Sequence, residues 1–203
     1  IKKNMNKLLF IIILFFSPFT LANVDLKKFS IEGISIGDSV ADYFPGREIT
    51  KNIVKQAGLT DEFYVAHFNK HESFSQFDQI YFIINPSTED ILFPIEGMSA
   101  FIDFKQDIEK CFEKKDSFVK QIVNIYKQEI NEKLIDINTA IKPHPSDLTG
   151  KSTYEQTDIK FPNGFIRIAC YDMQAHSGTN DALILDFFTE DVDRWLQNES
   201  KKT

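Results

Sequence analysis

The pattern of apolar positions along the chain predicts five β-strands. Five segments are rich in β-branched and aromatic residues, and they cover 63–69, 77–85, 91–103, 165–172 and 182–188. Short polar connections join the first three segments, which predicts an antiparallel meander.

A longer periodic segment predicts an α-helix. From Ile108 to Tyr126 the apolar residues recur at offsets of three, four, seven and eight, which places them on one stripe of a helix. Asp107 directly precedes this stripe and is a suitable N-cap residue. We therefore expect one long amphipathic helix from Ile108 to about Glu132.

Three shorter helices are predicted, over about 36–44, about 48–57 and the C-terminal segment TEDVDRWLQN at 189–198. Ser35 and Asp38 have the S-x-x-D spacing of a capping box before the first helix. Gly58 follows the second helix at a position typical of a C-terminal cap. Thr189 or Asp191 caps the third helix, whose early acidic residues complement the helix dipole.

The segment 136–163 shows no comparable period and is strongly polar, with KPHPSDLTGKS at its centre. We predict a long polar loop here, either a functional excursion or a mobile flap. The other elements predict an α+β fold: an antiparallel sheet of about five strands, with one long amphipathic helix and shorter N- and C-terminal helices packed on it.

The N-terminus has the layout of a secretory signal peptide. Its basic region contains Lys2, Lys3 and Lys7. The apolar run LLFIIILFF follows, and Ala22 supplies a small residue for cleavage. The run is shorter than the roughly 20 residues of a membrane-spanning helix; a buried N-terminal helix is the alternative. We expect residues 1–22 to be removed and 23–203 to form a single domain, exported to the periplasm or the extracellular space, without a stable membrane span after cleavage.

The net negative charge of the chain bears on whether it binds nucleic acid. The chain carries a net charge of −7, and the predicted signal peptide contains three lysines and no acidic residue, so its removal makes the charge −10. An acidic surface repels phosphate backbones, and no basic cluster follows residue 22. We therefore expect no nucleic-acid partner.

The chain contains two cysteines, Cys111 and Cys170. Alternation in the strand FIRIACYD places Ile166, Ile168 and Cys170 on one apolar face, and Cys111 lies on the apolar stripe of the long predicted helix. If this helix covers that face, both thiols enter one core layer, and export to an oxidising compartment then favours a disulfide. Two buried free thiols, or a chemically active cysteine, are the alternatives.

Three polar residues are candidates for a functional site: His144, Asp172 and His176. His144 lies in a P-H-P turn of the predicted loop, and long loops often carry function. Asp172 and His176 flank a short turn and could share a metal or a proton, although a polar hairpin without chemistry is the alternative. Because no zinc-ligand spacing, phosphate-binding glycine motif or G-x-S-x-G motif is present, we expect no metal, no cofactor and no assigned catalytic residue.

Twenty phenylalanines are many for 203 residues. We expect most of them in the core, because aromatic bulk dominates core burial. A surplus could line an apolar pocket or present an apolar surface to a partner.

Several segments carry a resemblance to known proteins: the signal peptide, the opening IEGISIGDS-x-x-DYF, the strand YFIIN, the helix with Cys111, and the segments HPSDLTGKS and IACYD. Together they resemble an uncharacterised family of small exported proteins from AT-rich marine bacteria, over nearly the whole chain after residue 22. The resemblance implies a cysteine at each of the two positions, which suits a bridge, and no assigned activity. The opening is also similar to the start of small envelope domains such as the outer-membrane assembly lipoproteins, but the lipobox cysteine is missing.

The sequence thus predicts an exported domain of unknown activity that acts as a binding or interaction module rather than as an enzyme. Its partner is expected to be an envelope protein or a small apolar ligand. Two alternatives remain. One is a small hydrolase-like enzyme that uses 136–163 as a lid and His144 as acid or base, and the other is a carrier that holds an apolar ligand among the phenylalanines.

Overall fold

The computed structural model describes residues 26–54, 62–86, 93–129, 136–145, 147–174 and 178–199. The predicted signal peptide, Gly58 and His176 lie outside these ranges. In the described part of the chain, no helix is both long and apolar enough to cross a membrane.

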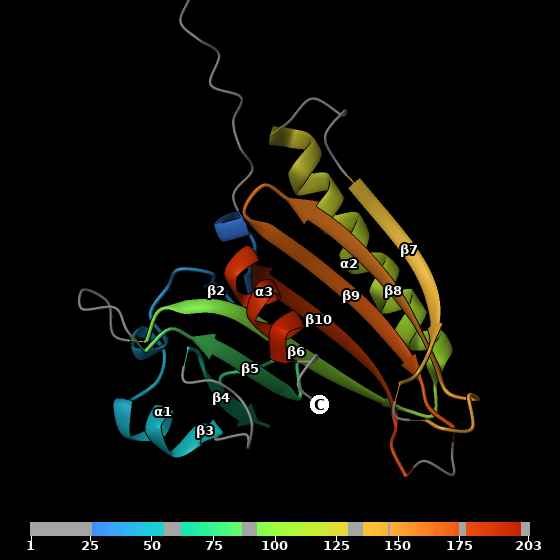
Figure 1. Ribbon diagram of the computed structural model, residues 1–203, viewed down its shortest axis with the longest axis horizontal. Helices are drawn as coiled ribbons and strands as arrows, with labels where there is room; N and C mark the ends of the chain where they lie inside the picture. The colour runs from blue at the N-terminus through green and yellow to red at the C-terminus, as the bar shows by residue number, and fades with distance from the viewer. Residues whose placement is uncertain are drawn as a thin grey trace, which may run out of the picture.

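An eight-stranded antiparallel sheet forms the centre of the protein (Figure 1). Its strands are β3 (Ile53–Val54), β4 (Tyr64–Asn69), β5 (Gln79–Ile84), β6 (Ile95–Lys105), β7 (Asp136–Pro143), β8 (Thr153–Phe161), β9 (Gly164–Asp172) and β10 (Asp181–Thr189). Their order across the sheet is β3-β4-β5-β6-β10-β9-β8-β7. Two four-stranded meanders therefore join where β6 pairs with β10.

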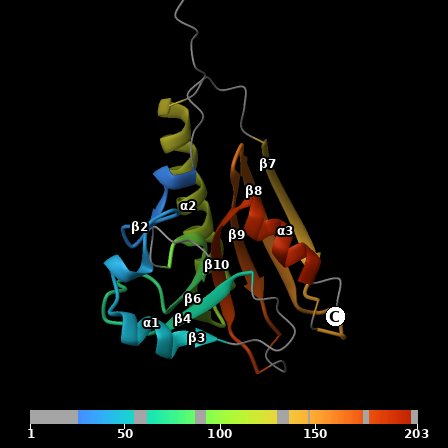
Figure 2. The same ribbon diagram turned by 60° about the vertical axis from the view of Figure 1, so that its left-hand side comes forward.

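Smaller elements surround this sheet: the strand pair β1 (Ser30–Ile31) and β2 (Ile34–Ser35), the 3-10 helices η1 (Leu26–Lys28) and η2 (Val40–Asp42), and the α-helices α1 (Gly46–Asn52), α2 (Ile108–Glu129) and α3 (Glu190–Glu199). α2 connects the two meanders and packs on β9 and β10, whereas α3 lies on the opposite face of the sheet (Figure 2). α1 packs against β4.

Strand alternation produces the main core. In β10 the side chains of Leu183, Leu185 and Phe187 point into the layer under α2, and they pack there with Cys111 and Ile122 of that helix. Lys115 interrupts the apolar stripe of α2 and is only 3% exposed. Because a buried charge requires a partner, its ammonium group pairs with Glu155 of β8. This ion pair ties the helix to the second meander.

A smaller core closes the opposite face. Its buried members are Phe63, Ile83, Phe188, Val192 and Trp195. Gly164 permits the close strand packing at this point, because its φ is +155° and a Cβ there would lie 2.1 Å from the carbonyl oxygen of Phe188. Only glycine fits this position without displacing the main chain.

The predicted sheet of about five strands is wrong, and the protein is mostly β. The five predicted segments are present as β4, β5, β6, β9 and β10, but β3, β7 and β8 extend the sheet to eight strands, with a separate two-stranded pair. Most of the predicted long polar loop, 136–163, is the hairpin β7–β8, and only 144–152 connects its strands. β7 forms one edge of the sheet and is almost entirely exposed, so main-chain pairing forms it and no apolar alternation marks it in the sequence.

The first predicted helix, 36–44, is also wrong, because only η2 within it is helical. The Asp38 carboxylate does accept a hydrogen bond from the Ser35 N–H, at 2.9 Å, which is half of the predicted capping box. However, the Val40 N–H donates to the Phe93 carbonyl, and the Asp38 carbonyl accepts from Ile95. These main-chain groups of Asp38 and Val40 therefore bond to the segment that leads into β6 and not to each other's helical partners.

The other predicted helices are present, and the predicted end of the long helix near Glu132 lies outside the described residues. The predicted caps of α2 and α3 form, because Asp107 accepts from the Lys110 N–H at 3.3 Å and Thr189 accepts from the Val192 N–H at 3.4 Å. The second predicted helix is α1, which ends at residue 52 and continues directly into β3.

Candidate functional site

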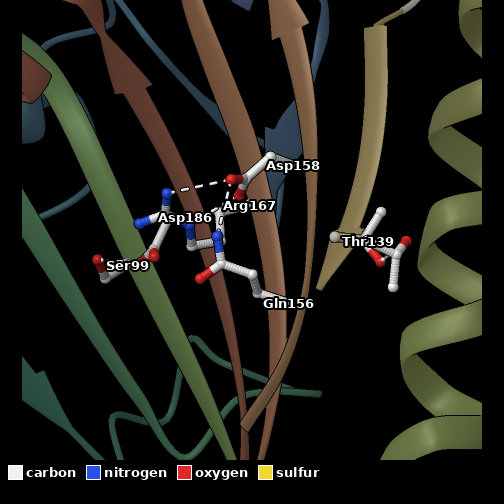
Figure 3. Close-up of polar contacts among 7 residues, drawn as sticks. Ser99, Thr139, Gln156, Asp158, Arg167 and Asp186 are labelled. Atoms are coloured by element: carbon white, nitrogen blue, oxygen red, sulfur yellow. Dashed lines mark hydrogen bonds and ion pairs between the residues drawn. The ribbon is translucent and has the colours of Figure 1, made fainter. Parts of the chain in front are cut away.

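The α3 face of the sheet carries a row of polar side chains that crosses four strands (Figure 3). The row consists of Ser99 on β6, Asp186 on β10, Arg167 on β9, and Asp158 and Gln156 on β8. Ser99 pairs with Asp186, Asp186 with Arg167, and Arg167 with Asp158 in the strand register. Because direct cross-strand neighbours on one face have closely spaced Cβ atoms, these side chains meet. Thr139, also drawn, bonds to the hydroxyl of Thr157 at 3.0 Å and lies nearer to α2.

The Asp158 carboxylate and the Phe165 ring hold the side chain of Arg167. Its Nε donates to Asp158 Oδ1 at 2.7 Å, and its second terminal nitrogen donates to Oδ2 at 3.3 Å. Its guanidinium carbon lies 5.1 Å from the centre of the Phe165 ring. Gln156, which is 5% exposed, donates to the same Asp158 carboxylate at 2.8 Å. The guanidinium group is thus fixed in one orientation, with N–H groups left for a further acceptor.

Asp186 is the most perturbed acidic group of the row. Loss of water around its carboxylate raises the pKa of Asp186 from about 3.8 to about 6, and the negative charge of Asp158 adds to the rise. The hydroxyl of Ser99, which donates to Asp186 Oδ1 at 2.6 Å, and the charge of Arg167 both oppose this rise. The carboxylate therefore changes its protonation state close to neutral pH.

This hydroxyl–carboxylate pair does not make a hydrolytic centre by itself. Ser99 lies within β6, which is paired on both sides, with β5 and with β10. The main-chain N–H groups around Ser99 therefore take part in the sheet, and none is left there to stabilise an oxyanion. The arrangement is suited to holding a polar ligand or a proton.

A pocket of about 370 Å³ adjoins the row, between α3 and the turn that joins β8 to β9. Its walls include Asp158, Lys160, Phe165, Arg167, Glu190 and Asp193. This volume lies within the range of small-molecule sites. The Glu190 carboxylate has no hydrogen-bond or ion-pair partner among the described residues, so it is available to a ligand.

A second pocket, of about 290 Å³, lies between α2 and the N-terminal segment 28–32. Its walls include the apolar side chains of Phe29, Phe77, Phe118, Ile122, Ile125 and Phe187, together with polar residues such as Lys28, Glu32 and Gln121. Ile125 is 41% exposed and stands at its mouth. Several phenylalanines thus line a cleft as well as the core.

The residues proposed from the sequence do not come together as one site. His144 lies at the start of the β7–β8 connection, with its ring centre 5.6 Å from that of Tyr171. Asp172 is the last residue of β9. Its suggested partner, His176, lies outside the described residues. Within the described ranges, no group of three or more histidine, cysteine or acidic side chains could hold a metal ion.

The two cysteines do come together as expected. Cys111 of α2 and Cys170 of β9 lie at disulfide distance, with Sγ atoms 2.07 Å apart. Both residues are fully buried in the main core. A buried bridge under α2 has a structural role and leaves no thiol for chemistry.

Comparisons with protein-family models, with curated proteins and with solved structures find no match for this chain. The resemblance to small exported proteins therefore stays a prediction.

The sequence contained one signal of the polar row. In DALILDFF the residues that alternate with Leu183, Leu185 and Phe187 are Ala182, Ile184 and Asp186. An acidic residue at the centre of an apolar strand, next to a strand with Arg167 on its outer face, indicates a cross-strand charge pair. Asp158 and Gln156 could not be added, because they lay in the predicted loop.

Proposed function

We propose that the protein is an exported binding domain, and that its ligand binds at the α3 face of the sheet, in the 370 Å³ pocket beside Arg167. The ligand is a small polar molecule. Export is supported by the N-terminal sequence pattern and by the buried cysteine pair, which suits an oxidising compartment.

The observation that carries the proposal is the polar row from Ser99 to Gln156, in which Ser99 bonds to Asp186, and Arg167 and Gln156 both bond to Asp158. Apolar residues of similar size would stabilise a sheet face at least as well as partly buried charges, because charges lose hydration when they are buried. A charged row beside a pocket, with one carboxylate whose pKa is strongly raised, is typical of a functional site. The fixed guanidinium of Arg167 and the free carboxylate of Glu190 supply opposite charges for orienting a ligand.

The ligand site is tested by two-dimensional NMR with ¹⁵N-labelled protein and a set of amino acids, monosaccharides and polyamines. We expect saturable shifts of amides in 158–167 and 190–197 with at least one member of the set. Glu190→Gln should weaken that binding at least about fivefold, because it removes a free charge from the wall. Asp191→Asn is the matched control, since this neighbour is exposed and outside the pocket wall. Saturable shifts that cluster elsewhere, or equal effects of the two variants, would overturn this site.

Export is tested separately by intact mass. The protein is produced with its own N-terminus and recovered from the periplasmic fraction. The proposal expects the mass of Asn23–Thr203 less two hydrogens, and no alkylation before reduction. An uncleaved chain in the cytoplasmic fraction would refute export, and this result does not depend on the ligand site.

The apolar pocket favours a second candidate function, the transport of an apolar ligand. Native mass spectrometry of the recovered protein should then show a co-purifying small molecule. Ile125→Lys at the mouth should abolish that species, whereas Ile141→Lys, on β7 and 70% exposed, should keep it. Absence of any bound species in both proteins would exclude a tightly held cargo. The hydrolase alternative required a lid over 136–163, and this segment is mostly the hairpin β7–β8.

A further inference from the structure

A third pocket lies between α1 and the turn that follows β4. In the strand order, β4 is near the opposite end of the sheet from β8. It encloses about 470 Å³. Its polar wall residues are Arg47, Glu48, Lys51, Asn52, Asn69 and His71. Phe68, which is 1% exposed, contributes apolar surface from the main core.

His71 and Glu48 hold the two sides of this pocket together. Nδ1 of His71 accepts a hydrogen bond from the Ser73 N–H at 3.2 Å, so the ring proton resides on Nε2. Nε2 lies 2.9 Å from the Glu48 carboxylate and donates to it. The rings of Phe44, Phe68 and Phe74 surround the imidazole with centroid distances of 5.1 to 5.9 Å. The only acidic group of the wall is thus engaged in joining the turn to α1.

The two cations of the wall have no such partner. Arg47 and Lys51 are one helical turn apart on α1, and both are exposed. The chain has only three arginines. Arg167 pairs with Asp158, and Arg194 pairs with Asp191. Within the described residues the side chain of Arg47 makes no hydrogen bond or ion pair, and neither does the side chain of Lys51.

We propose that this pocket is a binding site for an oxyanion, that is, a phosphate, sulfate or carboxylate group of a ligand. Two unpaired cations at one opening of a chain with a net charge of −7 create a local positive potential. An arginine guanidinium group matches the geometry of an oxyanion with paired N–H donors, and Lys51 adds a second charge. The amides of Asn52 and Asn69 in the same wall supply neutral donors. This site is independent of the α3-side pocket and of the binding function proposed for it.

The test is a titration of ¹⁵N-labelled protein with inorganic phosphate, sulfate and acetate, each against sodium chloride at equal ionic strength. We expect saturable shifts of the amides of 46–52 and 69–73 with at least one anion. Stronger binding of phosphate or sulfate than of acetate would assign a phosphate- or sulfate-bearing ligand, and the reverse order would assign a carboxylate. The double variant Arg47→Gln, Lys51→Gln should weaken the binding at least tenfold. Its stability should not change, because both side chains are exposed and unpaired.

The matched control is Arg194→Gln, which removes one exposed arginine on α3 and should change the affinity less than twofold. Two results would overturn the proposal. One is the absence of saturable shifts at 46–52 and 69–73 with all three anions. The other is binding that the double variant and the Arg194 variant weaken equally, since this would show a general charge effect.

Discussion

The raised pKa of Asp186 makes the stability of the protein depend on pH in a predictable direction. In the unfolded chain this aspartate ionises near pH 3.8, and in the folded protein it ionises near pH 6. Between these values the folded state holds a proton that the unfolded state has released. Its stabilising contribution is therefore complete below about pH 3.8, falls as the pH rises, and is lost above about pH 6.

The magnitude follows from the size of the shift. A difference of about two pKa units corresponds to about 3 kcal/mol between the two extremes of pH. Between pH 4.5 and pH 7.5 the part that is lost is about 2 kcal/mol, because the unfolded aspartate is already mostly ionised at pH 4.5. Asp186→Asn removes this contribution, while its amide oxygen still accepts the hydrogen bond from Ser99. The free energy of unfolding of the wild type, relative to the variant, should therefore fall by about 2 kcal/mol over this range.

The assay is urea unfolding at half-unit steps from pH 4.5 to 7.5, for both proteins. The difference between them isolates Asp186 from the other titrating groups. Asp116→Asn, at an exposed position of α2, is the control for the loss of one carboxylate from the protein surface. If the wild type and Asp186→Asn differ by the same amount at every pH, or if the wild type gains relative stability as the pH rises, the reasoning about this carboxylate is wrong.

Three further predictions concern stability. Replacing Cys111 and Cys170 by alanine should lower the free energy of unfolding by about 4 kcal/mol, since the bridge closes a loop of 59 residues; an unchanged urea midpoint would contradict this. Gly164→Ala should lower the free energy of unfolding by at least about 3 kcal/mol, because the alanine Cβ would clash with a main-chain oxygen. Gly150→Ala, also at positive φ but with open space around it, should cost only about 1 kcal/mol, and equal losses would exclude the clash as the cause. Trp195→Ala should lower the free energy of unfolding by about 3–5 kcal/mol, measured by thermal unfolding. Because the chain has one tryptophan, the fluorescence of the wild type reports directly on α3.

The sequence correctly predicted the elements that bury one face and expose the other. β9, β10 and α2 each have one apolar face, and the periods of two and 3.6 identify them. The cysteine pair followed from the same alternation, because Cys111 and Cys170 lie on the faces that meet. The pairing of two elements could thus be inferred without knowledge of the complete sheet.

The hairpin β7–β8 could not be predicted in this way. β7 is exposed along almost its whole length, so its side chains do not need to be apolar. In β8 the positions toward α2 include Thr157 and Glu155, which are polar because they bond to Thr139 and pair with Lys115. Main-chain hydrogen bonds between β7 and β8, and between β8 and β9, stabilise these strands. Apolar periodicity carries no information about such bonds.

The polar row was missed for a related reason. A cross-strand row requires the order and the register of the strands, and the strand that contributes Asp158 was absent from the predicted sheet. Asp186 and Arg167 alone indicate one charge pair, and the strand order that extends it to Ser99 and Asp158 could not be read from the sequence. The pKa of Asp186 in turn depends on the loss of water around it, which only the assembled sheet produces.

The position of α3 links stability to the proposed ligand site. Gly97 lies beneath this helix, and a Cβ there would lie 3.0–3.2 Å from side-chain atoms of Phe188, Ile83 and Val192. Gly164 is both a tight strand position and part of the 370 Å³ pocket wall. Substitutions at these glycines would therefore move α3 and reshape the pocket together. A loss of binding after such a change would carry no information about the ligand. A substitution at Glu190 changes the charge of the pocket wall, and Glu190 is not part of the smaller core. This separation makes a substitution at Glu190 the decisive test of binding at the α3 face.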